Sequence, residues 1–173
     1  SVCMGLRPRS IEDITAVIAL YRPGPMESIP RFLACSAHPE RITYQHPLLE
    51  PILAVTYGCI VYQEQVIEIF RQLAGFSLGQ ADMIRRAMSK KKEAVITAER
   101  AAFVHGDPAR SIPGAVANGV PEQTANAIYD EILAFASYAF NKSHAAAYSL
   151  LAYRTAYLRC HCLLYTSDAA DEA

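Results

Sequence analysis

Helix-start signals followed by apolar residues at helical spacing recur along this chain, and they constrain its fold more than any other feature. Ser10 followed by Asp13 has the pattern of a helix N-cap with an acid three residues later. The helix that follows must end at Arg22–Pro25, because its two prolines remove backbone donors and disfavour helical conformation before them. Ser77 followed by Gln80 is a second capping box of this kind, and it predicts a helix over residues 80–89. The sequence therefore predicts a chain of short, separately capped helices.

The remaining segments extend this pattern to the end of the chain. Tyr57–Tyr62 is β-branched and aromatic, which indicates either a short strand or a buried extended link. Asp107–Gly114, with two prolines and a glycine, is typical of an exposed loop, and Ser137–Lys142 of a turn. The fold class is mainly α, with room for one very short strand pair. We expect further helices over residues 28–34, 48–53, 63–74, 93–104, 121–136 and 144–161.

Composition limits the kinds of protein this can be. The 173 residues are 52% hydrophobic and 19% charged, which indicates a folded globular domain. A formal net charge of −1 means that any nucleic-acid site must be a local patch. No apolar run reaches the roughly 18 residues that span a bilayer, so we expect no membrane partner. Reduced thiols in a cytoplasmic protein are the simplest interpretation of the five scattered cysteines, Cys3, Cys35, Cys59, Cys160 and Cys162.

The last residues, 162–173, do not continue the pattern before them. They resemble the translation of a sequencing adapter read in frame, and the alternative is a natural polar tail. Leaving them out removes three of the 17 acids and none of the 16 Lys and Arg residues. The remainder, with 16 bases and 14 acids, carries a net charge of +2.

The strongest local signal for chemistry is a cationic cluster of five residues at the end of a predicted helix. Asp82 and Glu93 can neutralise only part of its charge. Guanidinium forks and lysine ammonium groups bind phosphate oxygens, so the cluster is a candidate polyanion site. A solvated basic face beside a helix C-terminus is the alternative, and the charges alone do not decide between them. The cluster consists of Arg85, Arg86, Lys90, Lys91 and Lys92.

A second candidate site is the turn Asn141–Lys142–Ser143–His144, which leads into a predicted helix capped by Ser143. Helix N-termini attract anions, and these side chains add a charge, a hydroxyl and an imidazole. The alternative is an ordinary capped helix with a packed histidine. Arg22, held beside Pro23 and Pro25, is either an anchor for a phosphate or carboxylate or part of a plain helix stop.

Catalytic signatures are lacking in the sequence. Its acids form no D-x-D pair, and there is neither a nucleophile elbow nor a Gly-rich phosphate loop. We therefore expect no catalytic residue and no metal ligand in this chain.

Six segments stand out in the order in which they occur: Ile18–Met26, His46–Leu53, Tyr57–Gln65, Leu73–Leu78, Arg85–Lys92, and Phe140–Tyr148 continued by Ala152–Leu158. Taken together and in this order, they resemble the bacterial DNA polymerase III alpha subunit, a C-family replicative polymerase. The resemblance that they carry extends over nearly all of residues 5–161.

The resemblance implies a fragment of a DNA-directed DNA polymerase, with residues 1–26 ending the palm and 27–161 forming the helical fingers. It implies that the basic cluster faces phosphates and that residues 141–144 line the nucleotide pocket. The catalytic aspartates and their Mg²⁺ would belong to a palm upstream, so this chain alone should be inactive. Implied partners are primer-template DNA, deoxynucleoside triphosphates, the sliding clamp and other replisome subunits.

The sequence departs from the family pattern in two places. Asp107–Pro113 looks like an insertion, and Ser137 and Ala139 stand where glycines are frequent in the family. An alternative to the polymerase interpretation is a standalone helical domain that binds nucleic acid or another protein.

Overall fold

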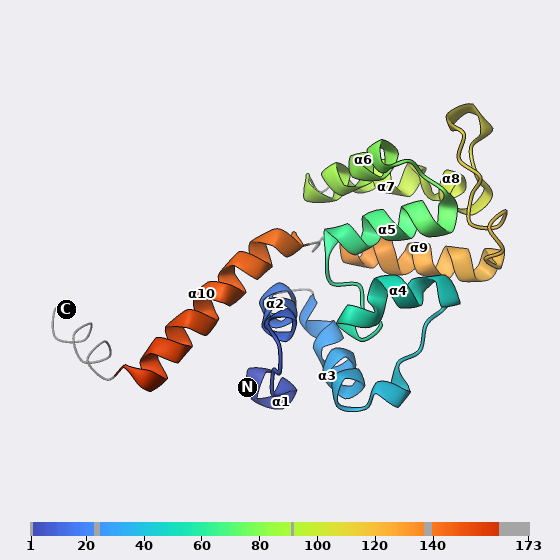
Figure 1. Cartoon of the computed structure of the whole chain (residues 1–173). Coiled ribbons are helices and arrows are strands. Elements are labelled where there is room, and N and C mark those ends of the chain that lie inside the picture. The colour runs from blue at the N-terminus through green and yellow to red at the C-terminus, as the bar shows by residue number, and fades with distance from the viewer. Residues whose placement is uncertain (1, 23–24, 91, 137–139, 163–173) are drawn as a thin grey trace.

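The structure, a computed structural model, describes residues 2–22, 25–90, 92–136 and 140–162 of the chain. Its regular elements within these ranges are helices, which confirms the mainly α fold class (Figure 1). Extended pairing in the same ranges is limited to two isolated bridges, Tyr62 with Phe140 and Asp107 with Ile112. The predicted adapter-like tail lies almost wholly outside the described residues, as do Ser137 and Ala139.

Ten α-helices and five short 3₁₀ turns make up the described chain. The α-helices are α1 Val2–Leu6, α2 Ile11–Leu20, α3 Ile29–Ala37, α4 Glu50–Leu53, α5 Gln63–Ala74, α6 Leu78–Ser89, α7 Glu93–Ala98, α8 Arg100–His105, α9 Glu122–Ala136 and α10 Lys142–His161. The 3₁₀ turns are η1 Pro25–Ser28, η2 Pro39–Arg41, η3 Pro47–Leu49, η4 Ala54–Thr56 and η5 Pro108–Arg110.

Both predicted capping boxes are present. The Ser10 hydroxyl accepts a hydrogen bond from the Asp13 N–H at 3.2 Å, and the Asp13 carboxylate accepts one from the Ser10 N–H at 3.1 Å. Ser77 and Gln80 exchange the equivalent bonds at 3.3 and 2.8 Å. Because Ser77 is the N-cap itself, α6 begins at Leu78, two residues before the predicted start.

One expectation for the middle of the chain was wrong, and another is confirmed only in part. The helix predicted over residues 93–104 is broken at Glu99, whose carboxylate forms an ion pair with Arg110 at 2.9 Å. The segment Asp107–Gly114 is not simply an exposed loop, because Ile112 is buried and Gly114 N donates to Ala74 O at 3.0 Å. Tertiary contacts between this segment and the α5 and α8 helices therefore override the local loop signal.

The larger hydrophobic core lies around α5 and α9. Figure 1 shows α6, α7 and α8 on one side of this pair and α4 on the other. At its centre the rings of Phe70, Phe76, Phe103 and Tyr129 meet edge to face, with centroids 4.9 to 5.9 Å apart. The Tyr129 hydroxyl donates to the carbonyl of Ile96, so this buried polar group is satisfied.

A smaller core joins α1, α2 and α3 to the link over residues 59–62. Residues 59–62 are extended and buried, as the second predicted alternative has it, whereas Tyr57 and Gly58, with φ of 52° and 81°, form a turn, so that prediction for Tyr57–Tyr62 is confirmed only in part. Gln65 holds the link in place, because its side-chain oxygen accepts from Val61 N and Tyr62 N at 2.9 and 3.0 Å. The predicted boundary between residues 26 and 27 stays a prediction, since a packing cluster is not by itself a functional domain.

The last helix, α10, packs against α2 through its first turns only. Ala145 and Ser149 are buried there, and the Ser149 hydroxyl lies 2.9 Å from that of Thr15. Residues 150–161 are exposed, and Figure 1 shows this part of α10 projecting from the body of the molecule. Within the described ranges, no helix is both long enough and apolar enough to cross a bilayer.

Candidate phosphate-binding interface

The basic cluster lies at the C-terminal end of α6. The apolar residues of α6 at Ala81, Ile84 and Met88 face the core, which leaves Arg85 partly exposed and Arg86 exposed. Lys90 is the C-cap residue and is exposed, as is Lys92, whereas Lys91 lies outside the described residues. The four described cations therefore share one solvent-facing end of α6 rather than being spread along the helix.

Asp82 organises the two arginines of the cluster. Its Oδ1 accepts from Arg85 Nε and its Oδ2 from Arg86 Nε, both at 2.7 Å. The hydrogen bond from Arg85, followed by that from Arg86, lowers the pKa of the Asp82 carboxyl below its ordinary value. Both contacts use Nε, and within the described part of the chain the terminal Nη groups have no ion-pair partner. The two guanidiniums are thus held in place with their outer edges available for phosphate oxygens.

The start of α10 differs from the prediction in its cap. Asn141, not Ser143, is the N-cap, because the Asn141 side chain accepts from His144 N at 3.1 Å. The reason lies in the preceding residue, Phe140, which forms an isolated β-bridge with Tyr62. The Phe140 carbonyl accepts a hydrogen bond from Gln63 N at 2.9 Å. This pairing keeps the backbone extended up to Asn141, so Ser143 falls inside the first helical turn.

Lys142 is held by two acids that sequence reasoning did not single out. Its Nζ lies 3.0 Å from Glu12 Oε2, and its backbone N–H donates to the Glu64 carboxylate at 3.1 and 3.2 Å. The Lys142 Nζ also lies 5.5 Å from the Tyr62 ring centroid. No local pattern reveals these contacts, since Glu64 is 78 residues from Lys142 along the chain.

The structure also brings Arg22 to the start of α10. Its guanidinium carbon lies 4.3 Å from the centroid of the Phe140 ring, a cation–π arrangement. The Phe140 ring in turn contacts the exposed His144 at 5.5 Å between centroids, and His144 contacts Tyr148 at 4.7 Å. Partial burial lowers the pKa of the Arg22 guanidinium from its ordinary value. Arg22 is thus an anchor for an aromatic side chain next to the second candidate site.

The two candidate sites lie at the same end of the α5–α6 pair. These helices are joined by only three residues, Gly75–Ser77, and pack against each other, so they run antiparallel. The end of α6 therefore lies beside the beginning of α5, to which the beginning of α10 is hydrogen-bonded. Figure 1 agrees, with the end of α6 and the start of α10 both at the left of the α5 and α9 pair.

Comparisons with known proteins show the family of the chain. The bacterial DNA polymerase III alpha subunit finger domain matches residues 1–110. The DNA polymerase III subunit alpha of Halalkalibacterium halodurans is 53% identical over 156 residues, which are 90% of this chain and 13% of that protein. The chain belongs to this finger domain family. The resemblance predicted from six segments is therefore confirmed.

Two other relatives give the finger domain the same assignment. The DNA polymerase III subunit alpha of Thermus aquaticus is 49% identical over 162 residues, which are 91% of this chain and 13% of that protein. The corresponding protein of Bacillus subtilis is 48% identical over 165 residues, 95% of this chain and 14% of its own length. The chain thus spans about one-seventh of the length of these relatives.

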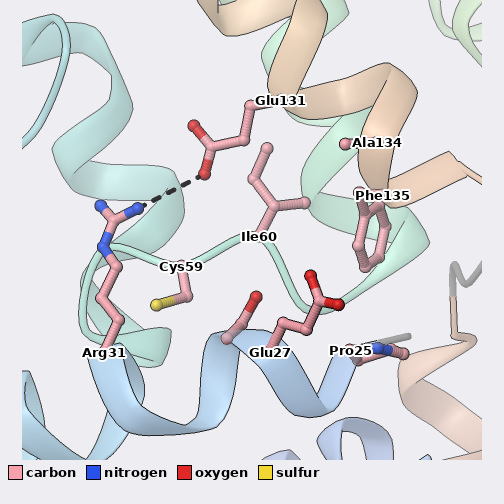
Figure 2. Close-up of a pocket in the computed structure, with 9 residues that line it drawn as sticks. Pro25, Glu27, Arg31, Cys59, Ile60, Glu131, Ala134 and Phe135 are labelled. Atoms are coloured by element: carbon pink, nitrogen blue, oxygen red, sulfur yellow. Dashed lines mark ion pairs between the residues drawn. The ribbon is translucent and has the colours of Figure 1, made fainter. Parts of the chain in front are cut away.

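The structure has a pocket of about 230 Å³ between α3 and α9, whose lining is acidic rather than basic (Figure 2). Arg31 and Glu131 lie on opposite sides of it with 3.7 Å between their nearest charged atoms, and Gln45 donates to Glu131 at 2.7 Å. Burial raises the pKa of Glu131, against the effect of Arg31 and Gln45. Glu27 adds a second carboxylate, so this pocket disfavours phosphate and its ion pair ties α3 to α9.

The described ranges contain no group of three or more His, Cys, Asp or Glu side chains arranged to hold a metal ion. The expectation that Mg²⁺ is bound outside this finger domain stays a prediction.

Proposed function

We propose that this chain is the fingers part of a DNA-directed DNA polymerase that binds the incoming deoxynucleoside triphosphate and the primer-template. The observation that carries the proposal is the paired placement of Arg85 and Arg86. Asp82 fixes both guanidiniums through Nε and leaves their Nη groups without an ion-pair partner among the described residues, near the C-terminal end of α6. Such forks suit the oxygens of a triphosphate or a DNA backbone.

The other residues of the interface have different parts in this proposal. Lys90, Lys91 and Lys92 add positive charge beside the arginine pair and attract polyanions through their summed field. Ser143 and His144 are exposed in the first turn of α10, where a hydroxyl and an imidazole can donate to phosphate oxygens.

Two residues of this interface mainly position the start of α10. Asn141 caps α10 and so directs the N–H groups of its first turn. The Lys142 ammonium can bind a phosphate only by giving up its ion pair with Glu12. Without a ligand, Lys142 therefore holds the start of α10 in place through its contacts with Glu12 and Glu64.

Catalysis in this proposal belongs to parts of the polymerase that the finger domain does not supply. The catalytic aspartates and Mg²⁺ lie in a palm, so residues 1–173 alone do not polymerise DNA. The proposed setting is the cytoplasmic replisome, where the sliding clamp and other subunits act on the whole polymerase. The names of the relatives, DNA polymerase III subunit alpha, support this assignment.

The test is steady-state kinetics of the complete polymerase carrying Arg85→Ala and Arg86→Ala together. Each arginine is expected to supply a charge-assisted hydrogen bond of roughly 1.5–3 kcal/mol, so loss of both should lower kcat/KM for nucleotide at least about a hundredfold. Arg71→Ala is the matched control, because Arg71 forms the same kind of i,i+3 pair with Glu68 at 2.7 Å on α5. Wild-type kinetics in the double variant, with folding retained, would refute the phosphate role.

A further inference from the structure

A second pocket, of about 540 Å³, lies among α1, the start of α2 and α3. Its walls include apolar residues of α1 and α3, and its polar lining comprises Arg7, Arg9, Asp13, Ser36 and Tyr57. None of these residues belongs to α6 or α10, and Figure 1 shows α1 and α3 on the side of the molecule away from α6 and α7. The pocket is therefore separate from the interface described above.

The acid in this pocket already accepts three hydrogen bonds. The Asp13 carboxylate accepts hydrogen bonds from Arg9 N at 2.8 Å, Ser10 N at 3.1 Å and the Tyr57 hydroxyl at 2.9 Å. Burial opposes its ionisation, but these bonds outweigh burial and lower the pKa of Asp13 below its ordinary value. The Tyr57 hydroxyl is also hydrogen-bonded to Ser36. Asp13 thus organises the pocket wall without pairing with either guanidinium.

The two arginines are the uncommitted groups of the pocket. Both are exposed, and within the described ranges neither guanidinium has an ion-pair partner. They flank Pro8, whose ring fixes its own backbone angle and stiffens the segment between them. Arg7 has a positive φ of 48°, which is uncommon outside glycine, and its N–H closes α1 on Cys3 O at 2.9 Å. The segment therefore places two cations beside a carboxylate that already accepts three hydrogen bonds.

We propose that this pocket is a second phosphate-binding site, in which the guanidiniums of Arg7 and Arg9 hold one phosphate group. Planar guanidinium forks match phosphate oxygens in geometry and in charge. The phosphate comes either from a free nucleotide or phosphate ion, or from the backbone of a nucleic-acid strand. The site does not depend on the function proposed for Arg85 and Arg86.

The experiment follows the side-chain Nε–H signals of the ¹⁵N-labelled chain by NMR at constant ionic strength. Inorganic phosphate is added first, and a short single-stranded oligonucleotide is added to a second sample. Saturable shifts of the Arg7 and Arg9 signals are expected with at least one ligand. Saturation by phosphate alone identifies the free-ion source, and saturation only by the oligonucleotide identifies the strand. Because each arginine reports separately, the Arg85 and Arg86 signals test the proposed function independently.

Variants complete the test. Arg7→Ala with Arg9→Ala should weaken binding at this site at least about tenfold, since two charge-assisted bonds are removed. Arg154→Ala with Arg159→Ala changes the net charge equally on the exposed part of α10 and should leave the affinity unchanged. Arg7→Lys with Arg9→Lys keeps both positive charges but removes the planar guanidinium groups, so it should also weaken binding. This variant tests the site if the alanine variant fails to fold. Unshifted Arg7 and Arg9 signals, or equal loss in the Arg154 and Arg159 control, would overturn the proposal.

Discussion

Replacing Gln65 with leucine should destabilise the fold far more than the same change elsewhere on α5. Gln65 is buried, and its oxygen is the acceptor for Val61 N and Tyr62 N. Its amide nitrogen donates to Ile52 O at 3.2 Å and to the Thr56 hydroxyl at 2.7 Å. Leucine fills a similar volume but leaves both N–H groups buried without an acceptor.

The magnitude follows from these orphaned groups. Each buried N–H without a partner costs about 1–3 kcal/mol, so the two cost roughly 2–6 kcal/mol. Burial of the leucine methyl groups returns about 1–2 kcal/mol. The net loss in free energy of unfolding should be about 3 kcal/mol, which lowers Tm by roughly 6–12 °C for a chain of this size.

The assay is urea unfolding followed by far-UV circular dichroism, with Gln72→Leu as the matched control. Gln72 lies on the exposed side of the same helix and bonds only Glu68, at 3.1 Å, so its replacement should cost less than about 0.5 kcal/mol. If Gln65→Leu unfolds at the same urea concentration as Gln72→Leu, the Gln65 network does not hold the link as described.

Three further predictions concern α10, α6 and the buried link. Asn141→Ala should lower the free energy of unfolding by about 1 kcal/mol through loss of the cap, whereas Ser143→Ala should leave urea unfolding nearly unchanged. Because the pKa of Asp82 is lowered, its stabilising contribution is present above the ordinary pKa of 3.8 and is lost as pH falls through the folded-state pKa. Asp82→Asn should therefore show a smaller fall in Tm than wild type across that acidic range. An equal fall in Tm would contradict the pairing of Asp82 with the two arginines. Burial raises the pKa of the Cys59 thiol to about 11, so Cys59 should react with a thiol reagent at pH 8 only after unfolding, while the exposed Cys3 reacts at once; equal rates in the folded chain would contradict its burial.

The parts of the fold that could be predicted are those fixed by neighbouring residues. The boxes at Ser10 and Ser77 each involve residues three apart, so the sequence states both partners together. The C-terminus of α5 is likewise local, because Gly75 takes the left-handed conformation with φ 75°. The predicted and observed ends of such helices therefore agree closely.

The expectations that were wrong depended on distant contacts. The cap of α10 is decided by the pairing of Phe140 with Tyr62, and the break at Glu99 accompanies its ion pair with Arg110. In the candidate site the cationic residues could be identified from charge alone. The contact between Lys142 and Glu64 of α5 could not be identified, because these residues are 78 positions apart and only the fold brings them together.

The most direct test of the central claim is the salt dependence of primer-template binding by the chain, measured by fluorescence anisotropy. If the five cations of the basic cluster contact phosphates, log K should fall with log salt concentration with a slope of up to about −4.5. Arg85→Ala with Arg86→Ala should reduce the steepness of that slope by about 1.8 while the fold is retained. An affinity that does not change with salt, or an identical slope in the double variant, would contradict the account.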